Sequence, residues 1–258
     1  MASDGKERGS KEPRRLEEVM PSPYNLDVSY SCVECKVRPE RTFCNLSKDA
    51  VQSLDAVKFT GVYPKGSLLF IEEEQPRGVF MLCSGRVKLT TSSSQGKTLI
   101  LKVAEPGELL GLSAAILGRP YEVSAETVEP CQVNFIKRED FLRFLSEYTE
   151  VSMHTAQQLS EKYHAAQKEI RSLGLSQSAR EKVSKLLLDW CASGGEDTPR
   201  GVRLKVLLTH EEIAQMIGTT RETITRLFSE LKKKKIIEIK GSTVMIINKS
   251  ALEKLVSV

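Results

Sequence analysis

The segment from Thr209 to Leu231 holds the side chains with the clearest chemical use. If it is helical, Arg221, Glu222, Thr225 and Arg226 share one polar stripe. A guanidinium can donate two hydrogen bonds to O6 and N7 of guanine, and a carboxylate can accept one from N4 of cytosine. Such side chains in the first two turns of a helix are typical of a helix that reads base edges in the major groove.

The residues around this stripe predict how it is positioned. Thr209 and Glu212 form the pattern of a capping box at the start of one helix. Gly218 allows a tight turn, and Thr219 or Thr220 can cap a second helix. A solvated helix face with a few charges is the alternative, but cap, turn and polar stripe together favour a helix-turn-helix. The residues predicted to meet DNA are Thr209, Thr219, Thr220, Arg221, Glu222, Thr223, Thr225, Arg226, Lys232 and Lys233.

The inward face of the second helix and the segment after it complete the pattern. Apolar residues follow the i, i+3, i+4, i+7 rule at Ile224, Leu227, Phe228 and Leu231. Residues 232–235 are four lysines, and residues 236–247 read as two short strands around a Gly-Ser turn, which is a wing. Residues 174–258 hold 15 Lys and Arg against 10 Asp and Glu, while residues 1–173 hold 23 against 24. The positive excess therefore lies where phosphates would be met.

The cysteines offer a second kind of chemistry. Cys32 and Cys35 form a C-x2-C pattern, and Cys44 follows after eight further residues. Three thiolates in a short segment with a distant fourth can hold an iron–sulfur cluster. Zinc binding, a thiol redox switch and no cofactor at all remain open alternatives. Cys83 and Cys191 lie in apolar runs, so we expect them in the core.

The elements that position these residues fall into four regions. Residues 1–30 are polar, charged and proline-containing, and we expect them to be disordered. Residues 31–137 hold the cysteine segment and short β-runs separated by recurring glycines, which predicts a β-roll or jelly roll acting as a sensor. Residues 138–174 read as a dimerisation helix with a hinge at Gly174, and residues 175–250 read as the winged helix-turn-helix domain.

The predicted dimerisation helix carries apolar or small residues spaced 3, 4, 3, 4, 3, namely Ala156, Leu159, Tyr163, Ala166, Ile170 and Leu173. This is an a/d seam over about two and a half heptads. A symmetric dimer would present two reading helices to two DNA half-sites. The alternative is a helix that lies on its own domain.

Other functional classes are not indicated. No run approaches 18 apolar residues and the charged N-terminus has no apolar core of a signal peptide, so we expect a cytoplasmic protein without a membrane span. His154, His164 and His210 are not spaced i, i+4, and no Walker loop, dinucleotide fingerprint or nucleophile elbow is present. We therefore do not expect an enzyme.

The order of β-roll, long helix and winged helix over residues 32–248 resembles the Crp/Fnr superfamily of bacterial transcription regulators. The stretches that carry the resemblance are residues 65–70, 84–89, 106–111 and 221–226. It implies an α+β fold with an N-terminal cyclic-nucleotide-binding-like roll, a dimerisation helix and a C-terminal winged helix-turn-helix. It also implies a homodimer on a palindromic DNA site, with RNA polymerase as a partner. The match of Arg221, Glu222 and Arg226 to the cyclic-AMP-responsive branch implies half-sites of the TGTGA type.

The resemblance also indicates whether the roll could sense a cyclic nucleotide. Cyclic-nucleotide members carry a Glu after the Gly of a short helix and an Arg-Ser or Arg-Thr pair about ten residues later. Here Leu112 follows Gly111, Arg119 precedes a proline, and Glu122 would repel a phosphate, so we do not expect a cyclic nucleotide.

The oxygen-sensing Fnr branch has an N-terminal cysteine trio and a fourth cysteine late in the roll. By that resemblance a [4Fe–4S] cluster would lie on Cys32, Cys35, Cys44 and Cys131, although the gap before Cys44 is longer than in well-known Fnr proteins. The expected function is a DNA-binding regulator controlled by a signal at the roll, with oxygen or redox state as the candidate. The alternatives are a small-molecule receptor module and a DNA-binding protein that needs no effector.

Overall fold

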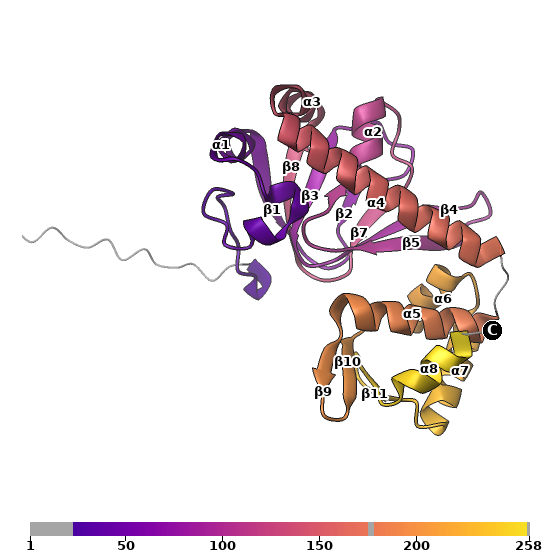
Figure 1. Cartoon of the computed structure of the whole chain (residues 1–258). Coiled ribbons are helices and arrows are strands. Elements are labelled where there is room, and N and C mark those ends of the chain that lie inside the picture. The colour runs from indigo at the N-terminus through magenta and orange to yellow at the C-terminus, as the bar shows by residue number, and fades with distance from the viewer. Residues whose placement is uncertain (1–22, 175–177, 257–258) are drawn as a thin grey trace, which may run out of the picture.

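The computed structural model describes residues 23–174 and 178–256 (Figure 1). Two four-stranded antiparallel sheets form the N-terminal roll, with strand orders β1-β8-β3-β6 and β2-β7-β4-β5. The strands are β1 (Lys58–Tyr63), β2 (Leu68–Phe70), β3 (Gly78–Ser84), β4 (Val87–Ser92), β5 (Thr98–Ala104), β6 (Leu109–Leu110), β7 (Ser124–Thr127) and β8 (Cys131–Lys137). The predicted β-roll is confirmed.

Two separate cores lie on the two faces of the sheet that contains β3 and β8. Side chains alternate between the faces of a strand, so neighbouring residues enter different cores. Phe80 and Leu82 of β3 join the inner core between the two sheets, together with Val133 of β8. Met81 of β3 and Ile136 of β8 join the outer core, which lies between this sheet and the surrounding helices.

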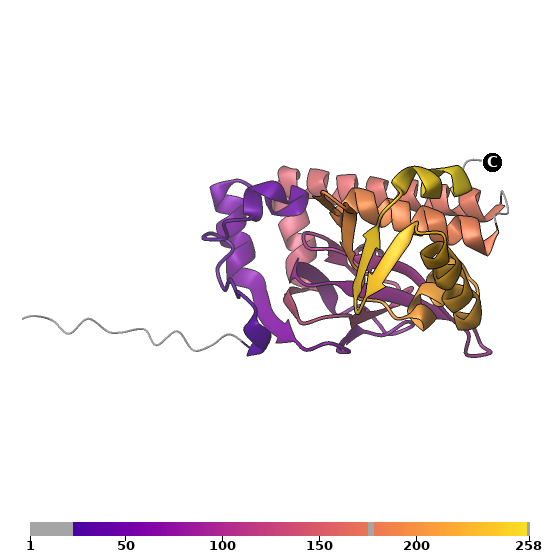
Figure 2. The ribbon, with the colours of Figure 1, turned by 90° about the horizontal axis from the view of Figure 1, so that it is seen from below.

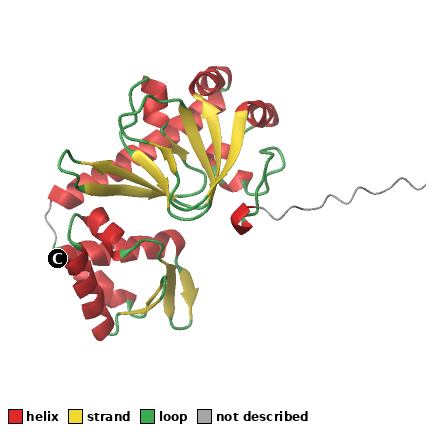
Figure 3. Ribbon diagram, turned by 180° about the vertical axis from the view of Figure 1, so that it is seen from behind, coloured by secondary structure: helices red, strands yellow, loops and turns green. Residues whose placement is uncertain are grey.

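The helices of the N-terminal half are η1 (Pro23–Asn25), η2 (Arg38–Glu40), η3 (Thr42–Cys44), α1 (Lys48–Val57), α2 (Leu112–Leu117), α3 (Arg138–Glu147) and α4 (Thr149–Gly174). All of them except η1 and η2 contribute side chains to the outer core. Phe43, Leu54 and Phe141 from three of them are at most 1% exposed. The helix α4 crosses one face of the roll, in front of the strands in Figure 1 and behind them in Figure 3.

Two features of these helices differ from the sequence-based expectation. The sequence suggested one helical stretch from Arg138, but the extended backbone of Tyr148 (φ −122°, ψ 105°) separates α3 from α4. The helix α1 was not predicted. Ser47 caps it by accepting a hydrogen bond from the backbone of Ala50, and it buries Ala50, Val51 and Leu54.

The C-terminal domain has a core of its own. It comprises α5 (Ala179–Gly194), β9 (Glu196–Thr198), β10 (Gly201–Lys205), α6 (His210–Ile217), α7 (Arg221–Lys233), β11 (Ile237–Lys240), β12 (Thr243–Ile246) and α8 (Lys249–Val256). The strand order of its sheet is β11-β12-β10-β9, so the wing predicted from β11 and β12 is extended by a second hairpin. Figure 2 shows this domain from below, with the wing strands in yellow. The predicted end at residue 250 falls inside α8, which packs on α5.

The N-terminal segment enters the fold earlier than predicted. The backbone N–H of Ser29 donates to Gln132 Oε1 at 3.1 Å, and Gln132 Nε2 donates back to Ser29 O at 2.6 Å. Lys58 Nζ donates to Tyr30 O at 2.6 Å. The boundary of the expected disordered segment at residue 30 is therefore too late, and residues 1–22 lie outside the described residues.

A buried tyrosine allows a test of the inner core. Tyr121 is 2% exposed, stacks on Phe70 with ring centroids 4.1 Å apart, and donates from its hydroxyl to Gly78 O at 2.9 Å. We expect Tyr121→Phe to lower the free energy of unfolding by about 1–3 kcal/mol, because a buried carbonyl loses its donor. Urea unfolding of the two proteins measures this difference. Tyr30→Phe is the control, since that side chain is 68% exposed. Equal stability of Tyr121→Phe and the parent would contradict the packing described here.

Candidate DNA interface and sensing site

The helix-turn-helix is held by local hydrogen bonds at each helix start. Thr209 and Glu212 form a reciprocal capping box at α6. Gly218 ends α6 with a left-handed backbone (φ 69°), a conformation that glycine adopts without strain. Thr220 then caps α7 by accepting a hydrogen bond from the backbone of Thr223. The geometry of the turn and of both helix starts is as the residue pattern predicted.

The two faces of α7 separate as predicted. Ile224, Leu227, Phe228 and Leu231 are at most 5% exposed and belong to the domain core. Arg221, Glu222, Thr225 and Arg226 are exposed on the opposite side. Within the described residues, neither Arg221 nor Arg226 forms an ion pair. Their donor groups are therefore available to an external acceptor, such as a base edge or a phosphate.

The remaining threonines and the lysines that were predicted to meet DNA lie outside the exposed stripe of α7. Thr209 and Thr220 are helix caps, and the hydroxyl of Thr223 lies 3.1 Å from that of Thr220. Thr219 is half-buried in the turn. Lys232 and Lys233 are exposed in the last turn of α7, at the end opposite to Arg221. The structure thus brings the arginines, Glu222 and Thr225 onto one face and leaves the lysines at its edge.

His210 contacts α7 behind this exposed face, a role that the sequence did not suggest. Its Nδ1 lies 3.0 Å from the hydroxyl of Thr225, and its ring stacks on Phe228 with centroids 5.2 Å apart. These contacts tie the start of α6 to the middle of α7. His210 therefore orients Thr225 within the exposed face.

The helix α4 has one face on its own domain and one face exposed. Gln158 accepts from the backbone of Leu109 at 3.1 Å and donates to Gly107 O at 2.9 Å, while Lys162 donates to Leu109 O at 2.7 Å. On the other side, Ala156, Tyr163 and Ala166 are exposed. Leu159 of the predicted seam is half-buried against the outer core. The side chains of Ile170 and Leu173 lie outside the described part of the chain.

Ion pairs join the roll to the C-terminal domain. Lys88 Nζ on β4 lies 3.1 Å from Glu126 and 2.9 Å from Glu212, which is also the capping-box residue of α6. Lys205 on β10 lies 3.8 Å from Glu129. The hairpin of β4 and β5 thus rests on α6 (Figure 1).

A cleft of about 360 Å³ also lies between the domains. Arg86 and Lys102 line it from the roll, and Trp190 and Met216 line it from the C-terminal domain.

Comparisons with known proteins match both domains. Residues 61–148 match the cyclic nucleotide-binding domain, and residues 181–255 match the Crp-like helix-turn-helix domain. The chain is 26% identical over 211 residues to the probable transcriptional regulator flp of Lacticaseibacillus casei, covering 82% of this chain and 93% of that protein. It is 25% identical over 194 residues to the cyclic AMP receptor protein of Thermus thermophilus, covering 75% and 86%.

The chain belongs to the Crp/Fnr family. The solved structure of FixK2 from Bradyrhizobium japonicum has the same fold, with a TM-score of 0.69 at 21% identity over 78% of this chain and 98% of that one. This Crp/Fnr protein is a DNA-binding transcription regulator with an N-terminal effector domain, and not an enzyme. No helix among residues 23–174 and 178–256 is long and apolar enough to cross a membrane.

The cysteines of this regulator are arranged differently from the set that the family resemblance implied. Cys131 is fully buried in the inner core, where its thiol lies 3.3 Å from Arg86 O and 3.2 Å from Glu129 O. Cys32 and Cys44 pack against the outer core instead. Cys131 therefore does not fit as the fourth ligand beside them, because the sheet lies between the two cores.

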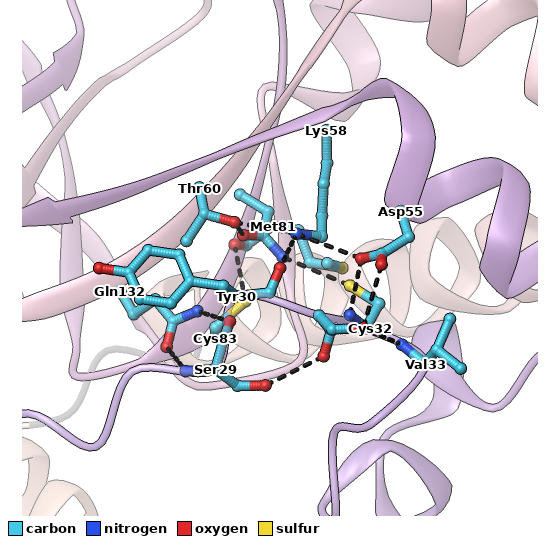
Figure 4. A network of polar contacts seen from close by, with 12 residues as sticks. Ser29, Tyr30, Cys32, Val33, Asp55, Lys58, Thr60, Met81, Cys83 and Gln132 are labelled. Carbon is cyan, nitrogen blue, oxygen red and sulfur yellow. Dashed lines mark hydrogen bonds and ion pairs between the residues drawn. The ribbon is translucent and has the colours of Figure 1, made fainter. Parts of the chain in front are cut away.

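Cys83, which the sequence predicted to lie in the core, packs on the outer core with Cys32 and Cys44. Its thiol lies 3.7 Å from Met81 O (Figure 4). Cys44 Sγ lies 3.6 Å from Met81 Sδ. In the part of the chain that the structure describes, no three His, Cys, Asp or Glu side chains are close enough together to hold a metal ion.

Burial controls the acidity of these thiols. It raises the pKa of Cys32 and of Cys83 to about 12, and that of Cys44 and of Cys131 to about 11. Redox-sensing thiols have lowered pKa values that populate the reactive thiolate. These four cysteines are therefore poor candidates for a simple thiol switch.

The positions that would meet a cyclic nucleotide carry no inward charge. Leu112, where cyclic-nucleotide members place a Glu, is 2% exposed and belongs to the outer core. Arg119 and Glu122 are both exposed at the surface of the roll.

The contact between the domains can be tested at Lys88. We expect Lys88→Met to speed amide hydrogen exchange in residues 207–217 by about two- to fivefold, because α6 loses a charged partner on the roll. Hydrogen exchange with mass spectrometry measures this rate peptide by peptide. Lys48→Met is the control, since Lys48 is exposed on α1, which lies away from α6 (Figure 1). Unchanged exchange in both variants would mean that the Lys88 pairs do not hold the domains together.

Proposed function

We propose that this regulator binds palindromic DNA with TGTGA-type half-sites as a homodimer, in the cytoplasm, and acts on transcription together with RNA polymerase. The observation that carries the proposal is the outward face of α7. There Arg221, Glu222 and Arg226 are exposed on a capped helix, and the arginines have no ionic partner within the described residues. A receptor module without a DNA target would leave this face unused.

The exposed face of α4 supports the dimer. Tyr163 is 63% exposed, although it is a large aromatic side chain. It follows the same side of the helix as Ala156 and Ala166. Burying this stripe against a second copy would remove it from water and place two recognition helices about one DNA turn apart.

The cysteine segment is the proposed entry point of the signal. An iron–sulfur cluster bound there would supply sensitivity to oxygen or redox state. Cys44 lies three residues before Ser47, whose backbone N–H donates to Glu150 of α4 at 3.1 Å. A change in the cysteine segment can therefore reach the start of α4 and the dimer face along a short path. We do not propose a cyclic nucleotide as the signal, since Leu112, Arg119 and Glu122 provide no phosphate site.

This coupling is a shift between two arrangements of the dimer. The cysteine segment is linked to α4 through Ser47 and Glu150, and Lys88 is linked to α6 through Glu212. Each link can affect the position of the recognition helix α7.

Base reading is tested by Arg226→Ala. We expect binding to a TGTGA-type duplex to weaken by about 1–3 kcal/mol and specificity to relax at one base pair in each half-site, because a bidentate contact is lost. Fluorescence anisotropy at several salt concentrations measures both effects. Lys233→Ala is the matched control. It should weaken binding to all sequences alike and reduce the salt slope by about one. If Arg226→Ala bound the specific duplex as the parent does at equal salt, α7 would not read bases through this residue.

The dimer is tested on the exposed face of α4. We expect Ala156→Lys with Tyr163→Lys to give monomers, because four like charges would meet in the interface without partners. Gln157→Lys with His164→Lys adds the same charge at the same spacing on a different part of the helix, where both residues are also exposed. Sedimentation velocity distinguishes the two pairs. A dimer that survives the first pair, or is lost equally in both, would move the interface elsewhere.

A further inference from the structure

Apolar side chains from both domains line the cleft of about 360 Å³ that lies between them. Leu101 and Val103 of β5 belong to its wall on the roll, and Trp190 of α5 and Met216 of α6 belong to its wall on the C-terminal domain. Leu101 is 52% exposed, so this apolar side chain meets water although other apolar side chains line the same cleft. A cleft of this size between two domains, with largely apolar walls, is a common setting for a small-molecule site.

The pairing of β4 with β5 directs Arg86 toward this cleft. Val87 pairs with Ala104, and both side chains belong to the inner core of the roll. Because side chains alternate between the faces of a strand, Arg86 lies on the opposite face, which lines the cleft. The backbone at Arg86 is held in place, since its carbonyl oxygen accepts from the backbone N–H of Val128 at 2.9 Å and from Cys131 Sγ at 3.3 Å.

Among the described residues, the guanidinium of Arg86 has no hydrogen-bond or ion-pair partner. Arg86 is half-buried, and a Cβ atom built on Gly194 would lie 3.8 Å from its Nη2. The side chain therefore reaches the C-terminal end of α5, one turn after Trp190. The carbonyl groups at that end of a helix favour a cation, but the N–H donors of the guanidinium stay available to an acceptor in the cleft.

The two lysines of the cleft already have carboxylate partners. Lys102 Nζ lies 2.6 Å from Glu108 Oε2, and the other oxygen of Glu108 accepts from the backbone of Glu105 at 3.0 Å. Lys205 Nζ lies 3.8 Å from Glu129. The lysines thus add little net positive charge, and Arg86 is the cation that an anionic ligand would meet.

Glu105 limits the charge that such a ligand can carry. It follows Ala104, the partner of Val87, so it lies across the β4–β5 ladder from Arg86. Its side chain is exposed, and it does not form an ion pair with Arg86. One negative charge can pair with the guanidinium, whereas a second charge in the cleft would be repelled by the carboxylate of Glu105.

We propose that this cleft binds a small monocarboxylate with an apolar body, and that Arg86 holds its carboxylate. The guanidinium would donate two parallel hydrogen bonds, and the apolar body would lie between Leu101 and Trp190. A ligand that contacts both domains stabilises the arrangement in which they lie together. The site is distinct from the N-terminal cysteines and from the exposed face of α7, so this proposal depends neither on a cluster nor on DNA binding.

Trp190 supplies the signal for the first test, because it is the only tryptophan of the chain. The full chain is titrated with phenylbutanoate and, in parallel, with the neutral phenylbutanamide, while the emission of Trp190 is followed. We expect the carboxylate to bind at least about tenfold more tightly, because only the carboxylate can form charged hydrogen bonds with Arg86. Inorganic phosphate, which carries more than one charge, should not displace it. Equal binding of both compounds, no change in emission with either, or displacement by phosphate would overturn the proposal.

The role of Arg86 is tested by Arg86→Met. We expect phenylbutanoate to bind about 10- to 100-fold more weakly and phenylbutanamide to bind as before, because the variant keeps an apolar side chain and loses only the charge. Arg119→Met is the matched control, since Arg119 is exposed after α2, on the side of the roll away from the C-terminal domain (Figure 1). An unchanged affinity in Arg86→Met, or an equal loss in both variants, would show that the anion binds elsewhere.

The apolar wall is tested by Leu101→Glu, which places a like charge beside the proposed carboxylate. We expect it to weaken phenylbutanoate binding at least about tenfold by repulsion and by loss of apolar contact. Leu117→Glu is the matched control, because Leu117 is 60% exposed on α2 and far from the cleft. Both leucines are exposed, so neither change should unfold the protein, and far-UV circular dichroism checks this. Equal affinities in the two variants would contradict the assignment of the cleft.

Hydrogen exchange shows whether the ligand joins the domains. With phenylbutanoate at about ten times its Kd, exchange that requires the domains to part should slow by about tenfold. We expect this protection in residues 99–105 of the roll and in residues 186–194 and 207–217 of the C-terminal domain. Protection confined to the roll would place the ligand inside that domain and would overturn the proposal, whatever the protein's affinity for DNA or content of iron.

Discussion

The alternation of side chains along β3 and β8 is the constraint on which the rest of the N-terminal domain depends. It sends Phe80, Leu82 and Val133 into the inner core and Met81, Asn134 and Ile136 toward the outer one. The inner core is closed on both sides by sheet, and Tyr121 fills part of it. The outer core is closed by helices, and Val151 and Leu159 of α4 are part of its packing.

Two routes connect the roll to the part of the molecule that meets DNA. One runs from the cysteine segment through Ser47 and Glu150 to α4, whose inner face is held by Gln158 and whose outer face is free. The other is the ion pair of Lys88 with Glu212. Glu212 also completes the capping box of α6, so the same carboxylate stabilises a helix start and joins two domains. Its pKa is lowered because hydrogen bonds from Thr209 and Lys88 outweigh the effect of burial.

In the C-terminal domain, contacts between residues close in the sequence determine more of the structure than in the roll. Thr209, Gly218 and Thr220 set the helix-turn-helix through contacts within a few residues, and Leu227 and Phe228 anchor α7 in the domain core. The consequence is that α7 is held by contacts within its own domain.

The sequence by itself determined the helix-turn-helix and the presence of a β-roll, because caps, turns and apolar periodicity depend on near neighbours. Of the predicted dimer seam on α4, Ala156 and Tyr163 are exposed while Leu159 packs against the outer core, and the dimer itself stays a prediction. It missed α1, the β9–β10 hairpin and α8, whose short segments are stabilised by packing on other elements. Which face of the sheet each cysteine occupies was decided only by the tertiary structure. Cys83 and Cys131 look equivalent along the chain, but strand register, set by pairing across the sheet, places one beside Cys32 and Cys44 and the other in the inner core.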